Sequence, residues 1–495
     1  MTCFRPFLAM ALLTGALPLV ACAPADGETA SSTAFQTDDG EGVTRLTFDG
    51  EVPSGGLDHF FVPFDVPAGT AEIQVRHDTL DDDNIIDWGI DDAAGTRGWG
   101  GGTSKPAILN AEAASPGYVR GAIKPGRWRV IGGKAKIEHS PAKYHVEIEL
   151  RTKPTLEAQH DRKPYAPRVA KHEARWYAGD FHVHSRDSTD ATPSIDEIAV
   201  YARAHGLDFV EISDHNVLGG QDYFAEAAAS HPDLLLLPGV EYTTYAGHAN
   251  GIGATRWVDH KIGQPGVTID GAVDAFHQQG ALFSINHPKL DLHQCIGCEW
   301  RHDLDGAKID AVEIANLGQA NGGAIMLPGA LGFWDGLCAR GHHAAALGGS
   351  DDHRAGESTG MFASRIGEPV TMVYAEELSA AGILEGIRNN RTVVKLRSSA
   401  DPMVDLTAEP GTAAEPAGTR HIRAKVTGLD GVPGAIVGVR LVKNALPNES
   451  VLVPTEGFTH DVAVTAPATG EDRYRAEVLV NGQLRTITSN VFVRR

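Results

Sequence analysis

Short runs of alternating hydrophobic and polar residues fill the chain from residue 43 to residue 151. Gly, Pro and Asp residues separate these runs, as expected for turns between strands. Short strands at this spacing are typical of β-sandwiches and jelly rolls, so we expect an all-β domain over residues 43–151. The same pattern returns over residues 401–495 and predicts a second β-sandwich. The runs lie at 58–64, 71–77, 126–131 and 144–150, and then at 421–427, 437–442, 459–464, 474–480 and 488–493.

Between these two regions, strand-like apolar runs alternate with stretches of helical period. Ser194 and Glu197 form a capping-box pattern, which predicts a helix that ends near His205. Further helices are expected at 269–279 and 378–389. Alternating strands and helices are typical of parallel sheets, open or closed into a barrel, so we expect an α/β domain over residues 176–398 after a Pro-containing linker at 152–175. Its strands are expected at 207–213, 234–240, 281–286, 311–316, 344–349, 370–374 and 392–396.

The first 21 residues have the pattern of a signal peptide. Their apolar run at 7–20 is shorter than a membrane span of about 20 residues. The Leu-Val-Ala-Cys sequence that ends at Cys22 resembles the lipobox of bacterial lipoproteins and implies that Cys22 is lipidated. This resemblance implies a lipid-anchored protein on the periplasmic side of a bacterial cell envelope, and Ala23 favours the outer membrane. An ordinary secretory signal or a membrane anchor is the alternative. Residues 22–42 are expected to form a flexible tether.

The composition limits the classes of partner. The chain has 495 residues, and its 64 Asp and Glu outnumber its 43 Lys and Arg, for a formal charge of −21. This balance argues against a nucleic-acid partner, which needs clustered Lys and Arg, but it leaves a small phosphate substrate open. The acidic run at 81–83, followed by Asp87, Asp91 and Asp92, is interpreted as a solvated turn. A Ca²⁺ site is the alternative, although the spacing differs from an EF-hand loop.

The cysteines are few and their number is odd after processing. Removal of residues 1–21 and lipidation of Cys22 leave Cys295, Cys298 and Cys338. We expect one disulfide and one buried thiol, with the pairing left open. A structural zinc site that joins Cys295 and Cys298 to His293 and His302 is the alternative.

The 22 His residues include several at the expected ends of strands. His182 and His184 are two residues apart, so both side chains lie on one face of an extended segment. His215, His287 and His353 each follow a predicted strand, as do Glu241 and Asp351, while His248 comes seven residues after Glu241. The carboxyl ends of parallel strands meet at one edge, and mixed His and carboxylate ligands suit Zn²⁺, Mn²⁺ or Fe²⁺. The sequence therefore predicts a metal centre at this edge.

This ordered set of motifs resembles the polymerase and histidinol phosphatase (PHP) superfamily of metallohydrolases. The resemblance covers residues 176–397 and is most similar to the CehA/McbA, or carbaryl-hydrolase-like, branch. It implies a distorted (β/α)7 barrel with two to three divalent ions. The implied first site consists of His182, His184, Glu241 and Asp351, and the second consists of Glu241, His248 and His287. The implied third site consists of His215, His353 and Asp190, with Asp187 as the alternative acid.

The resemblance also implies a reaction. A metal-activated water would attack the phosphoester of a small-molecule substrate, with Glu241 bridging two ions and His287 or His353 protonating the leaving group. Arg354 or Lys289 would neutralise a substrate oxygen, or would form a surface ion pair. Asp352 is expected to support the ligands, and Asp214 is expected either to orient an imidazole or to cap a strand.

Two other functions stay open at this stage. The first is hydrolysis of a carbamate, amide or ester, which the branch implies and which the acidic net charge slightly favours. The second is a non-catalytic, metal-containing binding lipoprotein, although an inactive site would be expected to lack at least one of the ligands. The two β domains are expected to bind a surface glycan or a protein partner, or to serve as spacers.

Overall fold

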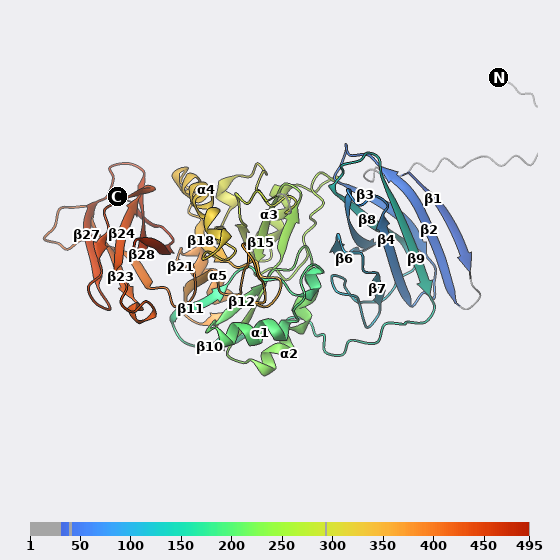
Figure 1. Cartoon of the computed structure of the whole chain (residues 1–495), viewed down its shortest axis with the longest axis horizontal. Helices are drawn as coiled ribbons and strands as arrows, with labels where there is room; N and C mark the ends of the chain where they lie inside the picture. Colours follow the sequence, from blue (N-terminus) through green and yellow to red (C-terminus); the bar gives the residue numbers. More distant parts are fainter. Residues whose placement is uncertain (1–30, 39–41, 293–294, 495) are drawn as a thin grey trace, which may run out of the picture.

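The computed structural model describes residues 31–38, 42–292 and 295–494, which form three units in a row (Figure 1). An N-terminal all-β unit and a C-terminal all-β unit flank a mixed α/β unit. Within the described residues, no helix is both long and apolar enough to cross a bilayer. The predicted signal peptide and Cys22 lie outside the described residues.

The N-terminal unit is a sandwich of two sheets, as the alternating pattern predicted. One sheet has the order β1-β2-β9-β4-β7 and the other has the order β3-β8-β5-β6. The large side chains between the sheets include Phe60, Trp88, Trp128 and Tyr144, all of which are buried. The strands are β1 (Ser31–Asp38), β2 (Val43–Val52), β3 (His59–Val66), β4 (Glu72–Thr79), β5 (Ile85–Asp92), β6 (Gly95–Gly101), β7 (Ala107–Asn110), β8 (Gly126–Lys136) and β9 (Ala142–Arg151).

Two details of this unit bear on the sequence predictions. The expected tether at 22–42 is wrong for residues 31–38, because these residues pair with β2 from Ser31 opposite Glu51 to Asp38 opposite Thr44. Without this segment, the edge of β2 would leave backbone N–H and C=O groups unpaired. Residues 31–38 pair with these groups as an added edge strand. The acidic run at 81–83 lies in a surface turn, where Asp81 accepts a hydrogen bond from the Asp83 N–H.

The middle unit contains the predicted strands and helices, with ends that differ from the expected ones by at most two residues. The capping box at Ser194 and Glu197 is present and begins α1. The helices are α1 (Ile195–Ala204), α2 (Phe224–Ser230), α3 (Ile269–His277), α4 (Leu327–Ala339) and α5 (Ala380–Arg388). Single 3-10 turns lie at η1 (Arg186–Ser188), η2 (Gly219–Tyr223), η3 (Gly306–Lys308) and η4 (Gly322–Ile325). The strands are β10 (Val169–Lys171), β11 (Arg175–Asp180), β12 (Phe209–Ile212), β13 (Leu235–Pro238), β14 (Glu241–Thr244), β15 (Gly247–Ile252), β16 (Leu282–Ile285), β17 (Ala311–Asn316), β18 (Ala345–Gly349), β19 (Val370–Ala375), β20 (Leu378–Ser379) and β21 (Thr392–Lys395).

The expected (β/α)7 barrel is not observed, because the strands do not close into one sheet among the described residues. One sheet joins β11, β12 and β13 in parallel, and a second joins β16, β17 and β18 in parallel. The β14–β15 hairpin lies antiparallel to β16, and β19 lies antiparallel to β11. Isolated bridges, such as that between His215 and Glu241, connect the two sheets, as do side-chain hydrogen bonds such as that from the Thr371 hydroxyl to the Gly348 carbonyl at 2.9 Å. The sequence pattern missed this division because a hairpin replaces a strand–helix repeat after β13.

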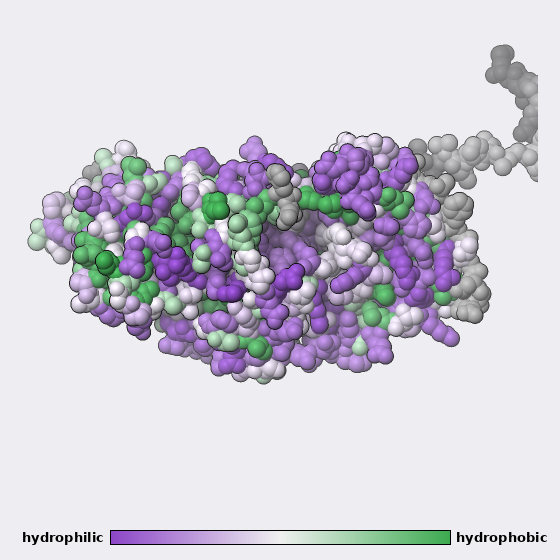
Figure 2. All heavy atoms as spheres, viewed as in Figure 1, coloured by the Kyte–Doolittle hydropathy of each residue, from purple (hydrophilic) through white to green (hydrophobic). Residues whose placement is uncertain are grey.

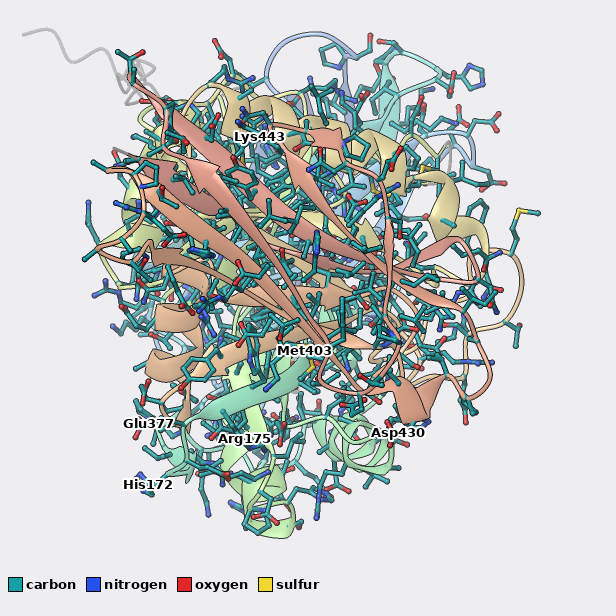
Figure 3. All side chains as sticks on the ribbon, turned by 90° about the vertical axis from the view of Figure 1, so that its left-hand side faces the viewer. His172, Arg175, Glu377, Met403, Asp430 and Lys443 are labelled. Carbon is teal, nitrogen blue, oxygen red and sulfur yellow. A yellow bond between two sulfur atoms is a disulfide. The ribbon has the colours of Figure 1, made fainter. Side chains whose placement is uncertain are left out.

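The C-terminal unit is a sandwich whose larger sheet continues into the middle unit. β21 pairs with β29, so that β13, β12, β11, β19 and β21 belong to the same 11-stranded sheet as β24, β28 and β29. The opposing sheet has the order β22-β23-β27. Figure 3 looks onto this sandwich from its outer side, with Met403 and Lys443 on its strands. The elements are β22 (Met403–Pro410), β23 (Thr419–Thr427), η5 (Leu429–Gly431), β24 (Val437–Lys443), β25 (Leu446–Pro447), β26 (Val451–Leu452), β27 (Thr459–Thr465), β28 (Glu471–Val480), β29 (Gln483–Thr488) and β30 (Val491–Arg494).

Candidate metal centre

The side chain of Glu241 lies at the centre of the predicted histidine cluster. Glu241 is the first residue of β14 and is 1% exposed. Its two carboxylate oxygens face imidazoles that come from four other segments of the chain. The nitrogen–oxygen distances are 3.3 Å to His182 Nε2, 3.5 Å to His184 Nε2, 2.9 Å to His215 Nδ1, 3.3 Å to His248 Nδ1 and 3.3 Å to His287 Nε2.

Asp351 provides a second carboxylate on the same side of the cluster. Its Oδ1 lies 3.4 Å from His182 Nε2 and 3.1 Å from His184 Nε2. Asp351 has a φ of 58° and His287 has a φ of 27°, which non-glycine residues rarely adopt. Such backbone conformations persist where the surrounding structure holds them, and they cluster at functional sites.

Asp190 lies between His215 and His353 and thus forms a third group. The Asp190 Oδ2 atom is 3.4 Å from His215 Nε2 and 3.4 Å from His353 Nε2. The alternative acid, Asp187, is buried in a different direction, where Arg162 faces it and the Gly117 N–H donates to its carboxylate. The structure therefore places Asp190, rather than Asp187, with the two histidines.

Charge and burial give these groups strongly perturbed pKa values. Burial opposes ionisation of Glu241, but the facing imidazoles of His182 and His215 hold the pKa of its carboxyl well below the usual range. Burial and the neighbouring imidazoles of His353 and His215 lower the pKa of His184 to about 3. Burial also opposes protonation of His353, but its hydrogen bond with Asp190 raises its pKa to about 9. Ligand sites show such shifts because groups of both charges are buried together.

Several ring nitrogens of this cluster are buried and make no hydrogen bond. They are the Nε2 atoms of His182, His184 and His248, and Glu241 Oε2 shares this property. Unpartnered buried polar atoms are costly, and divalent cations bound within the cluster would satisfy these atoms. The donor set of imidazoles and carboxylates therefore fits Zn²⁺, Mn²⁺ or Fe²⁺.

Sequence analysis missed Glu313, which lies in the middle of β17. Its Oε1 is 3.1 Å from His182 Nδ1, and its Oε2 accepts hydrogen bonds from the His287 N–H at 2.8 Å and from Asn316 Nδ2 at 3.1 Å. This carboxylate thus fixes the ring of His182 and the turn at His287. A single Glu within an otherwise apolar buried strand was the available sequence signal.

Asp214 and Asp352 support the loops of the cluster through backbone contacts. Asp214 accepts hydrogen bonds from the Ser185 N–H at 2.6 Å and from the Ser185 hydroxyl at 2.7 Å. It therefore caps the chain after His184, and both of these hydrogen bonds go to Ser185 rather than to an imidazole. Asp352 accepts from the N–H groups of Arg354 and Gly356, at 2.8 Å and 2.9 Å. Of the two roles expected for Asp214, the hydrogen bonds to Ser185 fit the capping role.

The two predicted cationic groups lie away from the cluster. Arg354 is exposed and does not line the cavity over the histidines. Lys289 is also exposed, and its Nζ forms an ion pair with Glu299 at 3.0 Å. The prediction that either side chain neutralises a substrate oxygen is wrong for this structure, because the turns after Asp351 and His287 direct both side chains outward.

Cys295 and Cys298 form a disulfide, and Cys338 is a buried free thiol. This arrangement agrees with the expected disulfide and excludes the alternative zinc site, because the two sulfurs are bonded to each other. His293 lies outside the described residues. His302 instead has its Nε2 2.7 Å from the Thr244 hydroxyl.

A cavity of about 540 Å³ lies over the cluster, between the N-terminal sandwich and the middle unit. The space-filling view shows this face hollowed where the two units meet (Figure 2). Sequence analysis did not foresee that the N-terminal sandwich lines this cavity. The residues from the sandwich are Asp87, Trp99, Gly100, Gly101, Gly102 and Thr103, and those from the middle unit are Ser188, Thr189, Asp190, His215, Thr243, His248, His287, Cys295, Ile296, Cys298, Asp351 and His353.

No protein-family model and no curated protein matches the chain. Among solved structures, a two-domain protein from Bacteroides vulgatus that contains a predicted PHP-like metal-dependent phosphoesterase is similar over 68% of this chain and 100% of its own, with 17% identity and a TM-score of 0.38. A candidate metal-dependent phosphoesterase from Bifidobacterium adolescentis is similar over 38% of this chain and 91% of its own, with 16% identity and a TM-score of 0.27. At TM-scores this low, neither similarity assigns a function to this chain.

Proposed function

We propose that this protein is a metal-dependent hydrolase of the PHP type that cleaves a phosphoester in a small molecule. The observation that carries the proposal is the convergence of five imidazoles on one buried carboxylate, Glu241, beneath an open cavity. Bound divalent ions would supply an activated water nucleophile and would neutralise charge on the phosphoryl oxygens.

The roles of the chain's own residues follow from their positions. Glu241 would contribute to both the first and the second ion site, because imidazoles of both sets face its carboxylate. The remaining ligands would be His182, His184, His248, His287 and Asp351, with His215, His353 and Asp190 at the third position. His287 and His353 also line the cavity, so either is placed to donate a proton to a leaving group.

The cavity also supports a second candidate, the hydrolysis of a carbamate, amide or ester. The residues that line it include Asp87, Asp190 and Asp351 and, among the described residues, neither Lys nor Arg. A carbonyl substrate without charge needs no cationic side chain, whereas a phosphoester would depend on the bound ions alone for neutralisation.

Elemental analysis and a substrate panel test these proposals on the purified full-length protein. We expect two to three equivalents of Zn, Mn or Fe, and less than one equivalent after reconstitution would contradict a multinuclear centre. Phosphomonoesters, phosphodiesters, carbamates and aryl esters are then assayed with Mn²⁺ and Zn²⁺. His184→Ala should remove activity, and His205→Ala, at an exposed position, is the matched control. Turnover of carbamates alone would favour the second candidate, and no turnover would favour a binding protein.

We also propose that lipid on Cys22 anchors the protein on the periplasmic side of a bacterial envelope. The support is the sequence before Cys22, and the β-sandwiches are then available to contact a surface glycan or another protein. Labelling with palmitate should disappear in Cys22→Ala, and continued labelling would contradict the anchor.

A further inference from the structure

The N-terminal sandwich forms one wall of the cavity over the metal centre. This wall, which we define as Asp87 of β5 together with residues 99–103 at the end of β6, lines the same cavity as Asp190 and His215. Three of its residues, Gly100, Gly101 and Gly102, have no side chain. The wall therefore leaves room for a group attached to the reacting bond, with Trp99 and Thr103 beside it.

Direct contacts hold this wall against the middle unit. The Tyr245 hydroxyl donates a hydrogen bond to Asp87 Oδ2 at 2.8 Å, and the Thr189 hydroxyl donates to the Gly100 carbonyl at 2.7 Å. Away from the cavity, Gln264 Nε2 donates to the His59 carbonyl at 2.8 Å. The wall is therefore a built part of the site, held directly by two hydrogen bonds, and the third bond holds the same sandwich against the middle unit.

The charge of the wall is the property that would discriminate among substrates. Asp87 is the one charged residue that the sandwich contributes to the lining, and no Lys or Arg from the described part of the chain offsets it there. In a partly buried site, an anionic group placed near this carboxylate would be repelled far more strongly than in water. A cation or a hydrogen-bond donor would be attracted.

We propose that this wall selects substrates by charge. It accepts a compact uncharged or cationic group next to the reacting bond and rejects an anionic one, with Asp87 as the residue that determines specificity. This inference rests on the proposed function only in placing the reacting group at the metal centre.

Binding of three phosphonates to the metal-loaded protein tests the proposal separately from turnover. The compounds are phenylphosphonate, 4-carboxyphenylphosphonate and 4-(trimethylammonio)phenylphosphonate, measured by calorimetry at pH 8. Burial raises the pKa of Asp87 to about 6, so its carboxyl is ionised at this pH. The wild type should bind the carboxylate compound about tenfold more weakly than the phenyl compound. Asp87→Asn should reduce this ratio to about threefold or less.

The matched control is Asp65→Asn, an exposed residue of the same sandwich, which should keep the wild-type ratio. Asp87→Ser replaces the Asn variant if near-ultraviolet circular dichroism shows that the latter is not folded. An unchanged ratio in the folded Asp87 variants, or equal binding of all three compounds by the wild type, would overturn the proposal.

If no phosphonate binds, the phosphoester function is contradicted but the wall is not. The same three aryl groups are then compared as methyl carbamates by their hydrolysis rates. The ratio of the hydrolysis rates of the phenyl and carboxyphenyl carbamates is then compared between the wild type and Asp87→Asn. A ratio that changes in the variant supports the role of the wall, and an unchanged ratio contradicts it.

Discussion

Replacement of Glu313 by Gln tests whether the buried carboxylate of β17 supports the metal centre. Glu313 accepts the His287 N–H at 2.8 Å and lies 3.1 Å from His182 Nδ1, so it contacts two candidate ligands at once. A glutamine has the same shape but only one acceptor oxygen. The His287 N–H and the Asn316 amide both donate to Glu313 Oε2. If the glutamine oxygen keeps these two bonds, its amide nitrogen faces His182 Nδ1, which then loses its acceptor.

The size of the effect follows from these contacts. One hydrogen bond to a charged group is lost, which costs about 1.5–3 kcal/mol. Loss of a partner that orients a ligand typically weakens metal binding by about 10–100-fold. The two estimates agree, because a tenfold change corresponds to about 1.4 kcal/mol. We therefore expect Glu313→Gln to weaken metal binding by about 10–100-fold while the folded structure persists.

Competition with a chromophoric chelator measures the affinity of the wild type and the variant for Zn²⁺. Glu299→Gln, which removes the partner of Lys289 at the surface, is the control and should not change the affinity. Unchanged affinity in a folded Glu313→Gln protein would refute the idea that this residue orients His182 and His287.

Three further predictions concern positions around the centre. Thr189→Val removes the hydrogen bond to Gly100 and should lower the metal content by about one equivalent, whereas Thr189→Ser should keep the wild-type content. Equal metal content in the wild type and both variants would exclude a role of this hydrogen bond in metal binding. Gly349→Ala would press a methyl group against His182 Cβ, so we expect a loss of about 1–3 kcal/mol in urea unfolding, and an unchanged midpoint would contradict the close packing. Burial lowers the pKa of His59 to about 3, so as the pH falls the unfolded state binds a proton before the folded state does. The free energy of unfolding should therefore fall as the pH drops from 6.5 towards 3, by up to about 1.4 kcal/mol per pH unit. His59→Phe should make the slope of urea-unfolding stability against pH shallower in this range, and an unchanged slope would argue against this residue.

The parts of the fold that depend on neighbouring residues were predictable. The capping box at Ser194 and the apolar period behind it locate α1, and the expected strand at 311–316 coincides with β17. The positions of the histidines were also predictable, because they follow strands whose ends meet. The grouping of His215 and His353 with Asp190 came from the family resemblance, and the structure brings these side chains together.

The remaining features depend on contacts between distant parts of the chain. Asp87 reaches the cavity from another unit, and a surface-like acidic residue in a β-sandwich carries no local signal for this role. The strained backbone at Asp351 and His287 is imposed by tertiary contacts rather than by residue type. The division of the middle strands between two sheets likewise depends on the β14–β15 hairpin, where the sequence pattern predicted no strands.

The pairing of β21 with β29 has a consequence for how the chain is synthesised and folded. The backbone edge of β21 stays open until a strand about 90 residues later has been made, since Val393 pairs with Thr488. A nascent or truncated chain that stops near residue 398 would expose this edge, which is a template for association with other chains. The boundary between the middle unit and the last sandwich is therefore a boundary of sequence pattern, while the shared sheet couples the folding of the two units.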